Sequence, residues 1–514
     1  MVESIKELKN NLILNFSFLF CLILILEGLP VPSGAEYSYL LLPIKHWNTN
    51  YLLNDWTFSQ PWLSHYVFNS VVGAFTPLFS LNTIGWTGRV LCWTLSIIAL
   101  FQIGKHFHIP RCLITLSISL WLINGQSIVA GSNIIGGFMA SSVAYVLLLF
   151  ALCALLSKRD ILSSILLGLS FSFHSAVGFW AILAIVPSLV ILKYPIKRLV
   201  QMSFYTALFS LPGLIPMLPV VFGRSSFSPD LWRFYVLVAQ PDHLDPFSWV
   251  RRDLLLVYIL FAFNWLHFRR VREDKTMKFF VSFQSFLCIF FSLGLFLRYT
   301  ENYELLKFYP FRLFAVFVPL FFFFHLMNAY YCRESIKLGT SATALALLAL
   351  LSFSNPLGQL VDHVHRTFSL WTKNEDDVQR CFKWISENTP NESIAILPPW
   401  RGDSWHLSRR GQIVNFGTPA HRLEEWRERI VALLGDNLRK QGEDWAGEFE
   451  ARYNRLTESD IAKIVERYGG EYLVSKRGYV YPVLFDTETY KVYSLRKIDL
   501  SSHQTLSHLA LHKQ

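Results

Sequence analysis

The chain reads GFMASSVAYVLLLFALCALLS from Gly137 to Ser157, and Lys158 and Arg159 follow directly. This stretch contains no charged residue. A helix needs about 20 mostly apolar residues to cross the roughly 30 Å hydrocarbon core of a bilayer. A basic pair at one end of such a stretch is typical of the cytoplasmic end of a transmembrane helix. The stretch therefore predicts a membrane-spanning helix.

Similar apolar stretches recur as far as about residue 354. The 514 residues are 52% hydrophobic and only 16% charged, a composition that excludes an ordinary soluble protein. We predict an α-helical polytopic membrane domain over residues 1–354, with about eleven spans. They cover residues 11–29, 86–104, 112–130, 137–157, 160–176, 177–193, 199–222, 254–268, 279–297, 313–331 and 338–354. The first span is expected to stay uncleaved, because Glu27 to Pro32 make a poor signal-peptidase site.

Basic residues between the spans predict the orientation. They occur in every connection that is cytoplasmic if the N-terminus lies inside, such as Lys193 to Arg198 and Arg269 to Lys278. This explains the net charge of +10 without a nucleic-acid partner. The segments 30–86, 223–253 and 298–312 are then extracytoplasmic, and so is the C-terminus. We predict a multi-pass protein of the bacterial plasma (inner) membrane.

The composition changes at about residue 355, where charged residues become frequent and long apolar stretches stop. We predict a soluble extracytoplasmic α/β domain over residues 355–514. Its helices are expected at 376–388, 423–434 and 459–468, and its strands at 393–397 and 472–475. Of the seven cysteines only Cys381 falls in this domain, so it contains no disulfide framework or CxxC metal site.

Two carboxylates lie in the first outer loop, residues 30–86. Glu36 and Asp55 are its only acids, among aromatic and apolar residues typical of a segment that lies along a membrane interface. A reaction at the bilayer surface that needs a base would use one of them. In the alternative interpretation both are solvated or cap helices, as Asp55 could for a helix that begins near Trp56.

Four basic or titratable residues lie at the predicted outer ends of spans. His174 stands between two apolar stretches, where an ionisable group is costly unless it faces a polar cavity. Three arginines are exceptions to the rule that arginine is enriched on the cytoplasmic side: Arg89, Arg298 and Arg312. A guanidinium at the outer end of a span could hold a lipid-linked phosphate. The alternatives are a satisfied interfacial histidine and arginines that extend to the interface.

One loop of the soluble domain is dense in polar and aromatic side chains. It runs from Leu397 to Arg410, after a predicted strand, and contains Asp403 and His406. Loops after strands often build sites in α/β domains, so this pair could bind a substrate group or a metal ion. A solvated loop anchored by its tryptophans is the alternative. The chain has no GxGxxG, Walker or zinc motif.

The order of these features resembles the C-type glycosyltransferase (GT-C) superfamily. The likeness lies in a first helix, a long outer loop with an early acid, many further spans and an outer α/β domain. Within it, an uncharacterised bacterial family is similar in the segments Glu36–Tyr39, Pro43–Trp56, His174, Phe382–Pro399 and Glu425–Arg429. The resemblance implies a base or metal ligand at Glu36 or Asp55, and phosphate-binding arginines at Arg298 or Arg312. A divalent metal ion is the cofactor it implies, although the paired acids of the superfamily are here a lone Glu36 with Asp55 far along the chain.

The function that follows is transfer of a sugar from a polyprenyl-phosphate donor to an acceptor at the outer face of the membrane. Membrane lipid, the lipid-linked sugar and an acceptor of unknown identity are the expected partners. A non-catalytic membrane protein that presents a C-terminal domain for binding to the cell envelope is the first alternative. A transporter or flippase is the second, and it would show two related halves with broken helices.

Overall fold

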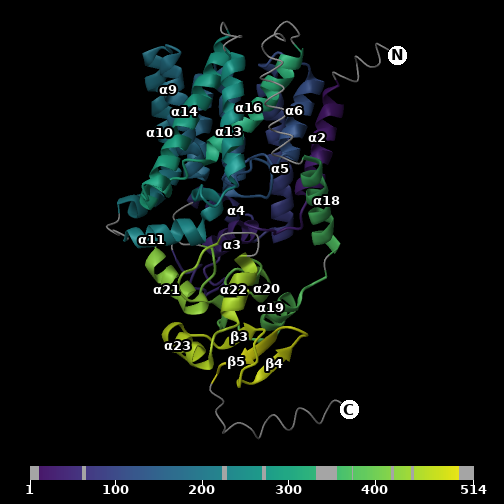
Figure 1. The fold of residues 1–514 in the computed structure, drawn as a ribbon, viewed down its shortest axis with the longest axis vertical. Helices are drawn as coiled ribbons and strands as arrows, with labels where there is room; N and C mark the ends of the chain where they lie inside the picture. The colour runs from purple at the N-terminus through teal and green to yellow at the C-terminus, as the bar shows by residue number, and fades with distance from the viewer. Residues whose placement is uncertain are drawn as a thin grey trace.

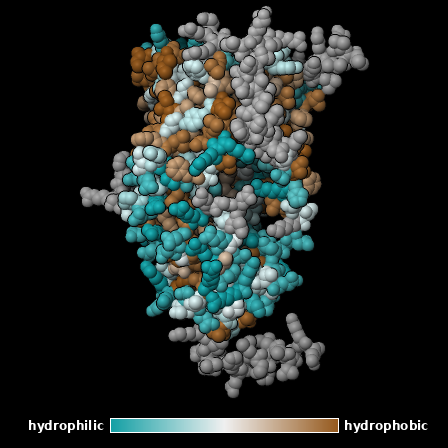
Figure 2. Space-filling model, viewed as in Figure 1, coloured by the Kyte–Doolittle hydropathy of each residue, from teal (hydrophilic) through white to brown (hydrophobic). Residues whose placement is uncertain are grey.

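The computed structural model describes residues 11–60, 65–222, 228–268, 274–331, 356–372, 374–417, 422–440 and 445–496. Figure 1 shows two parts: a bundle of long helices at the top and a smaller part with helices and a sheet at the bottom. The surface of the bundle is largely hydrophobic in Figure 2, and that of the lower part is largely hydrophilic. This division agrees with a helical membrane protein that carries a C-terminal domain.

Within the described residues the bundle contains ten longer helices. They are α2 (Leu12–Glu27), α5 (Leu81–Lys105), α6 (Arg111–Ile123), α7 (Ala140–Leu156), α8 (Asp160–Phe173), α9 (Ser175–Ile191), α10 (Ile196–Phe222), α13 (Arg251–Phe268), α14 (Lys275–Tyr299) and α16 (Arg312–Tyr331). Side-chain oxygens of Asn11, Ser80 and Asp274 cap the first turns of α2, α5 and α14. Helix α16 is the most enclosed, since every residue from Leu313 to Met327 is buried.

The number of long apolar helices is smaller than the number of predicted spans. Among the described residues four helices are long and apolar enough to cross a membrane: α5, α10, α14 and α16. Each of the other predicted spans up to residue 331 coincides with a helix, but α2, α6, α7, α8 and α9 have at most 17 residues. Helices of that length reach about 26 Å at 1.5 Å per residue, short of the roughly 30 Å core. The predicted span 338–354 lies outside the described residues.

Two of the short helices end at identifiable breaks. Helix α6 stops at Ile123, seven residues before the predicted end at residue 130. Asn124 and Gly125 follow, and Gly125 adopts a φ of +76°, in the left-handed region that glycine tolerates. Helices α8 and α9 are separated by His174 alone, whose backbone is extended (φ −148°, ψ 99°).

The C-terminal part is an α/β domain around one mixed sheet. Its strands are β1 (Ile394–Ile396), β2 (Gly411–Gln412), β3 (Tyr472–Ser475), β4 (Val483–Asp486) and β5 (Lys491–Ser494), in the order β2-β1-β3-β5-β4. Strand β1 pairs in parallel with β2 and β3, whereas β5 is antiparallel to β3 and β4. Its helices are α19 (Asp377–Asn388), α20 (Ser404–Ser408), α21 (Leu423–Leu434), α22 (Trp445–Tyr453) and α23 (Glu458–Tyr468), and α18 (Pro356–Thr372) leads into it from the bundle.

Short helices fill the boundary between the two parts (Figure 1). They are α3 (Glu36–Trp47), α4 (Tyr66–Gly73), α11 (Pro229–Phe234), α12 (Pro241–Leu244) and α15 (Tyr303–Leu306), with a π-helix at Tyr235–Ala239. They belong to the three segments that the sequence predicts to be extracytoplasmic. Helix α11 packs on α15 and on α21 of the C-terminal domain, and α3 packs on α20. The three segments therefore lie on the side of the bundle that carries the C-terminal domain.

Candidate functional site

Glu36 lies in the first turn of α3 and forms a buried ion pair with Arg89 of α5. The Arg89 Nε donates to Glu36 Oε1 at 2.7 Å, and a second guanidinium nitrogen bonds Oε2. The backbone N–H groups of Phe138 (2.5 Å) and Ser33 (3.1 Å) donate to the same carboxylate. Both side chains are 1% exposed. The sequence predicted that Glu36 acts on the acceptor and that Arg89 binds a phosphate. The structure brings the two side chains together, and their charges neutralise each other.

Asp55 lies at the contact between the first outer loop and the C-terminal domain. Its Oδ2 accepts from the Trp405 indole at 2.9 Å and from the Gln412 backbone at 3.0 Å, while Oδ1 accepts from the Phe58 backbone at 2.8 Å. The side chain is fully buried. Burial raises the pKa of Asp55 to about 6, although these hydrogen bonds oppose the shift. Asp55 caps a turn, not the helix expected near Trp56.

Arg298, at the end of α14, also has a carboxylate partner. Its Nε donates to Asp245 Oδ1 at 2.7 Å, and both side chains are at most 10% exposed. The guanidinium also lies over the ring of Phe247, with 4.4 Å between its carbon and the ring centroid. Its charge is already compensated within the protein.

Arg312, the first residue of α16, is different. Its Nη1 lies 3.1 Å from Nε2 of His174, and its guanidinium carbon lies 5.0 Å from the centroid of the Tyr309 ring. Among the described residues none of the ion pairs includes Arg312, and its buried Nε has no hydrogen-bond partner there. The structure thus brings His174 and Arg312 together, and the part of the chain that it describes provides no counter-charge for this arginine.

Aromatic and histidine side chains surround the pair, and we call them with it the Arg312 cluster. The rings of His65 and His174 are 4.8 Å apart, and the Tyr39 hydroxyl lies 3.4 Å from His65 Nε2. On the other side the hydroxyls of Tyr235 and Tyr309 are 2.9 Å apart. The cluster consists of Tyr39, His65, His174, Tyr235, His243, Tyr309 and Arg312, and it combines residues from all three predicted outer segments with the α8–α9 break.

The electrostatics of the cluster favour neutral histidines. Burial lowers the pKa of His65 to about 4, and the positive charge of Arg312 adds to that shift. His243 behaves in the same way, with a pKa lowered to about 4 by burial and by Arg312. Among the described residues the positive charge of Arg312 is therefore uncompensated and lies beside neutral hydrogen-bonding groups, an arrangement suited to an anion.

The divalent metal ion implied by the resemblance does not fit these residues. The oxygens of Glu36 accept from Arg89 and backbone N–H groups, and those of Asp55 accept from three N–H groups. In the part of the chain that the structure describes, no three His, Cys, Asp or Glu side chains are placed to hold a metal ion. Asp403 does not pair with His406, because Arg401 and Gln379 bind its carboxylate.

No protein-family model matches the chain, and no curated protein matches it either. The likeness to the C-type glycosyltransferases therefore stays a prediction based on the residues of this chain.

Tyr39, His65, Tyr235, His243 and Tyr309 were missed as members of the site. His65 carries one usable signal, since it stands among aromatic residues of the first outer loop. Its backbone adopts the left-handed region with a φ of +61°, which is uncommon for a residue other than glycine and is concentrated at functional sites. The π-helix at Tyr235–Ala239 is another such feature, because π-turns inside helices often occur at functional sites.

Proposed function

We propose that the Arg312 cluster binds the phosphate of a polyprenyl-phosphate-linked sugar, and that the protein transfers this sugar to an acceptor hydroxyl. The observation that carries the proposal is the contrast among three arginines. Arg89 is paired with Glu36 and Arg298 with Asp245, whereas Arg312 has no carboxylate partner among the described residues. The Arg312 side chain is partly buried, and its Nε is fully buried without a hydrogen-bond partner among the described residues. Such a group is costly without a counter-charge, and a bound phosphate would remove that cost through paired charge-assisted hydrogen bonds.

The position of Arg312 suits a lipid-linked donor. It begins α16, which runs through the apolar bundle, and it lies on the side that carries the C-terminal domain. A polyprenyl chain could remain in the lipid while its phosphate reaches this level. The predicted orientation makes this side extracytoplasmic, so both the donor and an envelope acceptor would meet the protein there.

The residues suggest a direct displacement without a metal ion. The acceptor oxygen forms a bond to the anomeric carbon as the bond between that carbon and the phosphate oxygen breaks. The leaving polyprenyl phosphate keeps the electron pair, and Arg312 stabilises its negative charge. The acceptor proton passes to His65, which is neutral at pH 7 because its pKa lies near 4. A phosphate beside His65 would raise that pKa and make the histidine a better proton acceptor.

In this proposal Glu36 and Asp55 are positioning residues. Glu36 connects α3 to α5 through Arg89, and Asp55 connects the first outer loop to the C-terminal domain. Both carboxylates already accept several hydrogen bonds, which leaves them poorly placed to take a proton from an acceptor. The first outer loop would then contribute Tyr39 and His65 to the reaction.

Transfer from labelled undecaprenyl-phosphate hexoses by the full-length protein in lipid nanodiscs tests the proposal. Arg312→Gln should reduce donor binding and sugar transfer by at least 100-fold. Arg312→Lys should retain only part of the wild-type binding and transfer, because lysine cannot form the two parallel hydrogen bonds of a guanidinium. Lys307→Gln is the matched control, since it removes a positive charge from the same outer segment, where Lys307 pairs with Glu304. Equal donor binding by wild type and Arg312→Gln would reject the proposal.

A further inference from the structure

The C-terminal sheet has a topological switch point. Strand β1 lies between β2 and β3. From β1 the chain passes through α20 to β2 on one side, and it later returns through α21, α22 and α23 to β3 on the other side. Because β2, β1 and β3 are parallel, the carboxyl ends of β1 and β3 point the same way and their connections diverge there. In open α/β sheets, ligands bind in the crevice outside the carboxyl ends of the strands at such a point.

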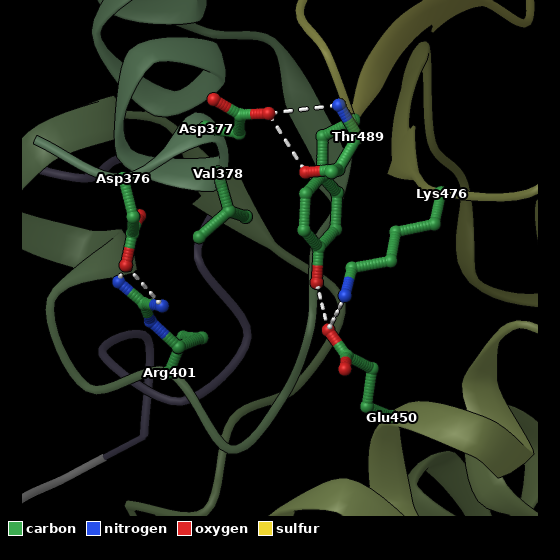
Figure 3. A pocket seen from close by; sticks show the side chains of 8 residues that line it. Asp376, Asp377, Val378, Arg401, Glu450, Lys476 and Thr489 are labelled. Carbon is green, nitrogen blue, oxygen red and sulfur yellow. Dashed lines mark hydrogen bonds and ion pairs between the residues drawn. The ribbon is translucent and has the colours of Figure 1, made fainter.

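A pocket of ≈ 400 Å³ is present at this place. Arg401 follows β1 and Lys476 follows β3 directly, so both lie beyond the carboxyl ends of the two parallel strands. The start of α19, helix α22 and the turn before β5 complete its wall (Figure 3). Its lining residues are Asp376, Asp377, Val378, Arg401, Glu450, Lys476, Thr489 and Tyr490. We call it the switch-point pocket.

The charges of the switch-point pocket are compensated within the protein. Arg401 pairs with Asp376 at 3.0 Å, and Lys476 pairs with Glu450 at 2.9 Å (Figure 3). Asp377 forms an ion pair with a neighbouring arginine of α19 and accepts hydrogen bonds from the backbone and hydroxyl of Thr489 at 2.7 and 2.8 Å. The pocket therefore offers many strong donors and acceptors but no large net charge.

This pattern selects among ligand classes. An anion would meet three carboxylates in the lining, and an apolar ligand would remove five charged groups from water without replacing their hydrogen bonds. A neutral polyol replaces them, because each hydroxyl donates to a carboxylate and accepts from arginine, lysine or threonine. Tyr490 is only 7% exposed, so its ring belongs to the domain core, and its phenol donates to Glu450 and fixes that carboxylate at the pocket.

We propose that the switch-point pocket binds a neutral saccharide. The site is distinct from the Arg312 cluster, since its lining residues all come from residues 376–490 of the C-terminal domain. It would let the domain hold a glycan of the cell envelope on the same side of the bundle as the Arg312 cluster. The proposal does not depend on sugar transfer, because a saccharide bound here serves a transferase and a non-catalytic envelope protein equally.

An array of neutral, acidic and amino-substituted oligosaccharides, probed with the full-length protein in nanodiscs, tests this proposal. We expect neutral oligosaccharides to bind, and the affinity for the strongest neutral binder to fall at least tenfold in Lys476→Ala. Tyr490→Phe, which keeps the ring and removes the hydroxyl, should weaken binding less. Lys491→Ala is the matched control, because Lys491 is similarly exposed (38% against 39%), is also ion-paired, and lies outside the pocket.

Three outcomes would overturn the proposal: no neutral oligosaccharide binds, acidic or amino-substituted ones bind better, or Lys476→Ala and Lys491→Ala bind alike. A cooperative thermal transition of each variant near that of the wild type establishes that the domain is folded. Arg312→Gln should leave saccharide binding unchanged, and Lys476→Ala should leave donor-lipid binding unchanged. The two proposals therefore fail in separate measurements.

Discussion

The carboxylate of Asp55 accepts a hydrogen bond from the indole nitrogen of Trp405 at 2.9 Å, across 350 positions of the chain. The same oxygen accepts from the Gln412 backbone at 3.0 Å. Next to it the Trp56 indole donates to Glu425 at 2.6 Å. Through these bonds the first outer loop holds the C-terminal domain against the bundle.

Trp405→Phe should weaken this contact. The substitution keeps an aromatic ring beside Phe58, whose ring centroid lies 4.9 Å from that of Trp405, but removes one donor from a buried carboxylate. Loss of a hydrogen bond to a charged group costs about 1.5–3 kcal/mol. Hydrogen exchange should then speed up in residues 51–60 and 404–412. Trp384→Phe, a truncation of equal size where the ring stacks on Phe485 in the same domain, should leave exchange in these segments unchanged.

Asp55 should also give the stability of the protein a distinct pH dependence. Its pKa is about 6 in the folded protein and about 3.9 in an unfolded chain, so the folded state binds the proton more tightly. The Asp55 contribution to the free energy of unfolding should therefore increase as the pH falls from about 6 to 4, on the order of 2 kcal/mol in total. The melting temperature of the wild type minus that of Asp55→Asn should therefore increase as the pH falls from about 6 to 4. A difference that is constant with pH would contradict the raised pKa.

Local patterns of the sequence predicted the elements, and long-range contacts decided the site. The helix at 423–434 and the strand at 472–475 were predicted with the bounds that the structure has, because their apolar periodicity is set by residues close in the chain. The sequence also singled out Arg312 and His174, whose polarity stands out in an apolar context. It could not show that Arg89 and Arg298 have acidic partners, since each partner is 53 positions away and found only by folding.

The same limit applies to the strands and the spans. Strands β4 (Val483–Asp486) and β5 were not predicted, although they are as long as β3. All four residues of β3 are buried, whereas three of the four residues of β4 are exposed and only two of β5 are buried, so their apolar pattern is weaker. The sequence contains eleven apolar stretches, but some of the helices that the structure describes end at turns such as Asn124 and Gly125, whose position depends on tertiary contacts. His65 was not predicted as a site residue for a related reason: it meets His174 only when residues of the first outer loop pack against the α8–α9 break.

The buried pair Glu36–Arg89 should behave as a structural unit. Glu36→Gln leaves the guanidinium of Arg89 buried without a counter-charge, and breaking such a pair costs about 3–5 kcal/mol. Arg89→Gln should cost a similar amount. The double variant Glu36→Gln/Arg89→Gln should be less destabilised than the sum of the two, because it leaves no unpaired charge. Thermal unfolding of the four proteins in nanodiscs measures this coupling, and additive losses would show that the two side chains are independent.

His65 should couple donor binding to proton uptake. In the free protein its pKa lies near 4, so it is neutral at pH 7. A bound phosphate beside it would stabilise the imidazolium and raise this pKa. Binding then takes up a proton, and by linkage the affinity for the donor should increase as the pH falls from 7 to 5. Undecaprenyl-phosphate mannose is the appropriate probe, because its phosphodiester does not itself titrate in this range.

His65→Gln should make the affinity for this probe independent of pH while keeping most of the affinity at pH 7, where the wild-type imidazole is neutral. His108→Gln is the control, since that histidine is exposed and pairs with Asp274 instead of lying near Arg312. Titrations at pH 5, 6 and 7 with the three proteins measure the effect. If the affinity of His65→Gln still depends on pH, another member of the Arg312 cluster takes up the proton. If the affinity of the wild type does not depend on pH, His65 has no place in the proposed mechanism.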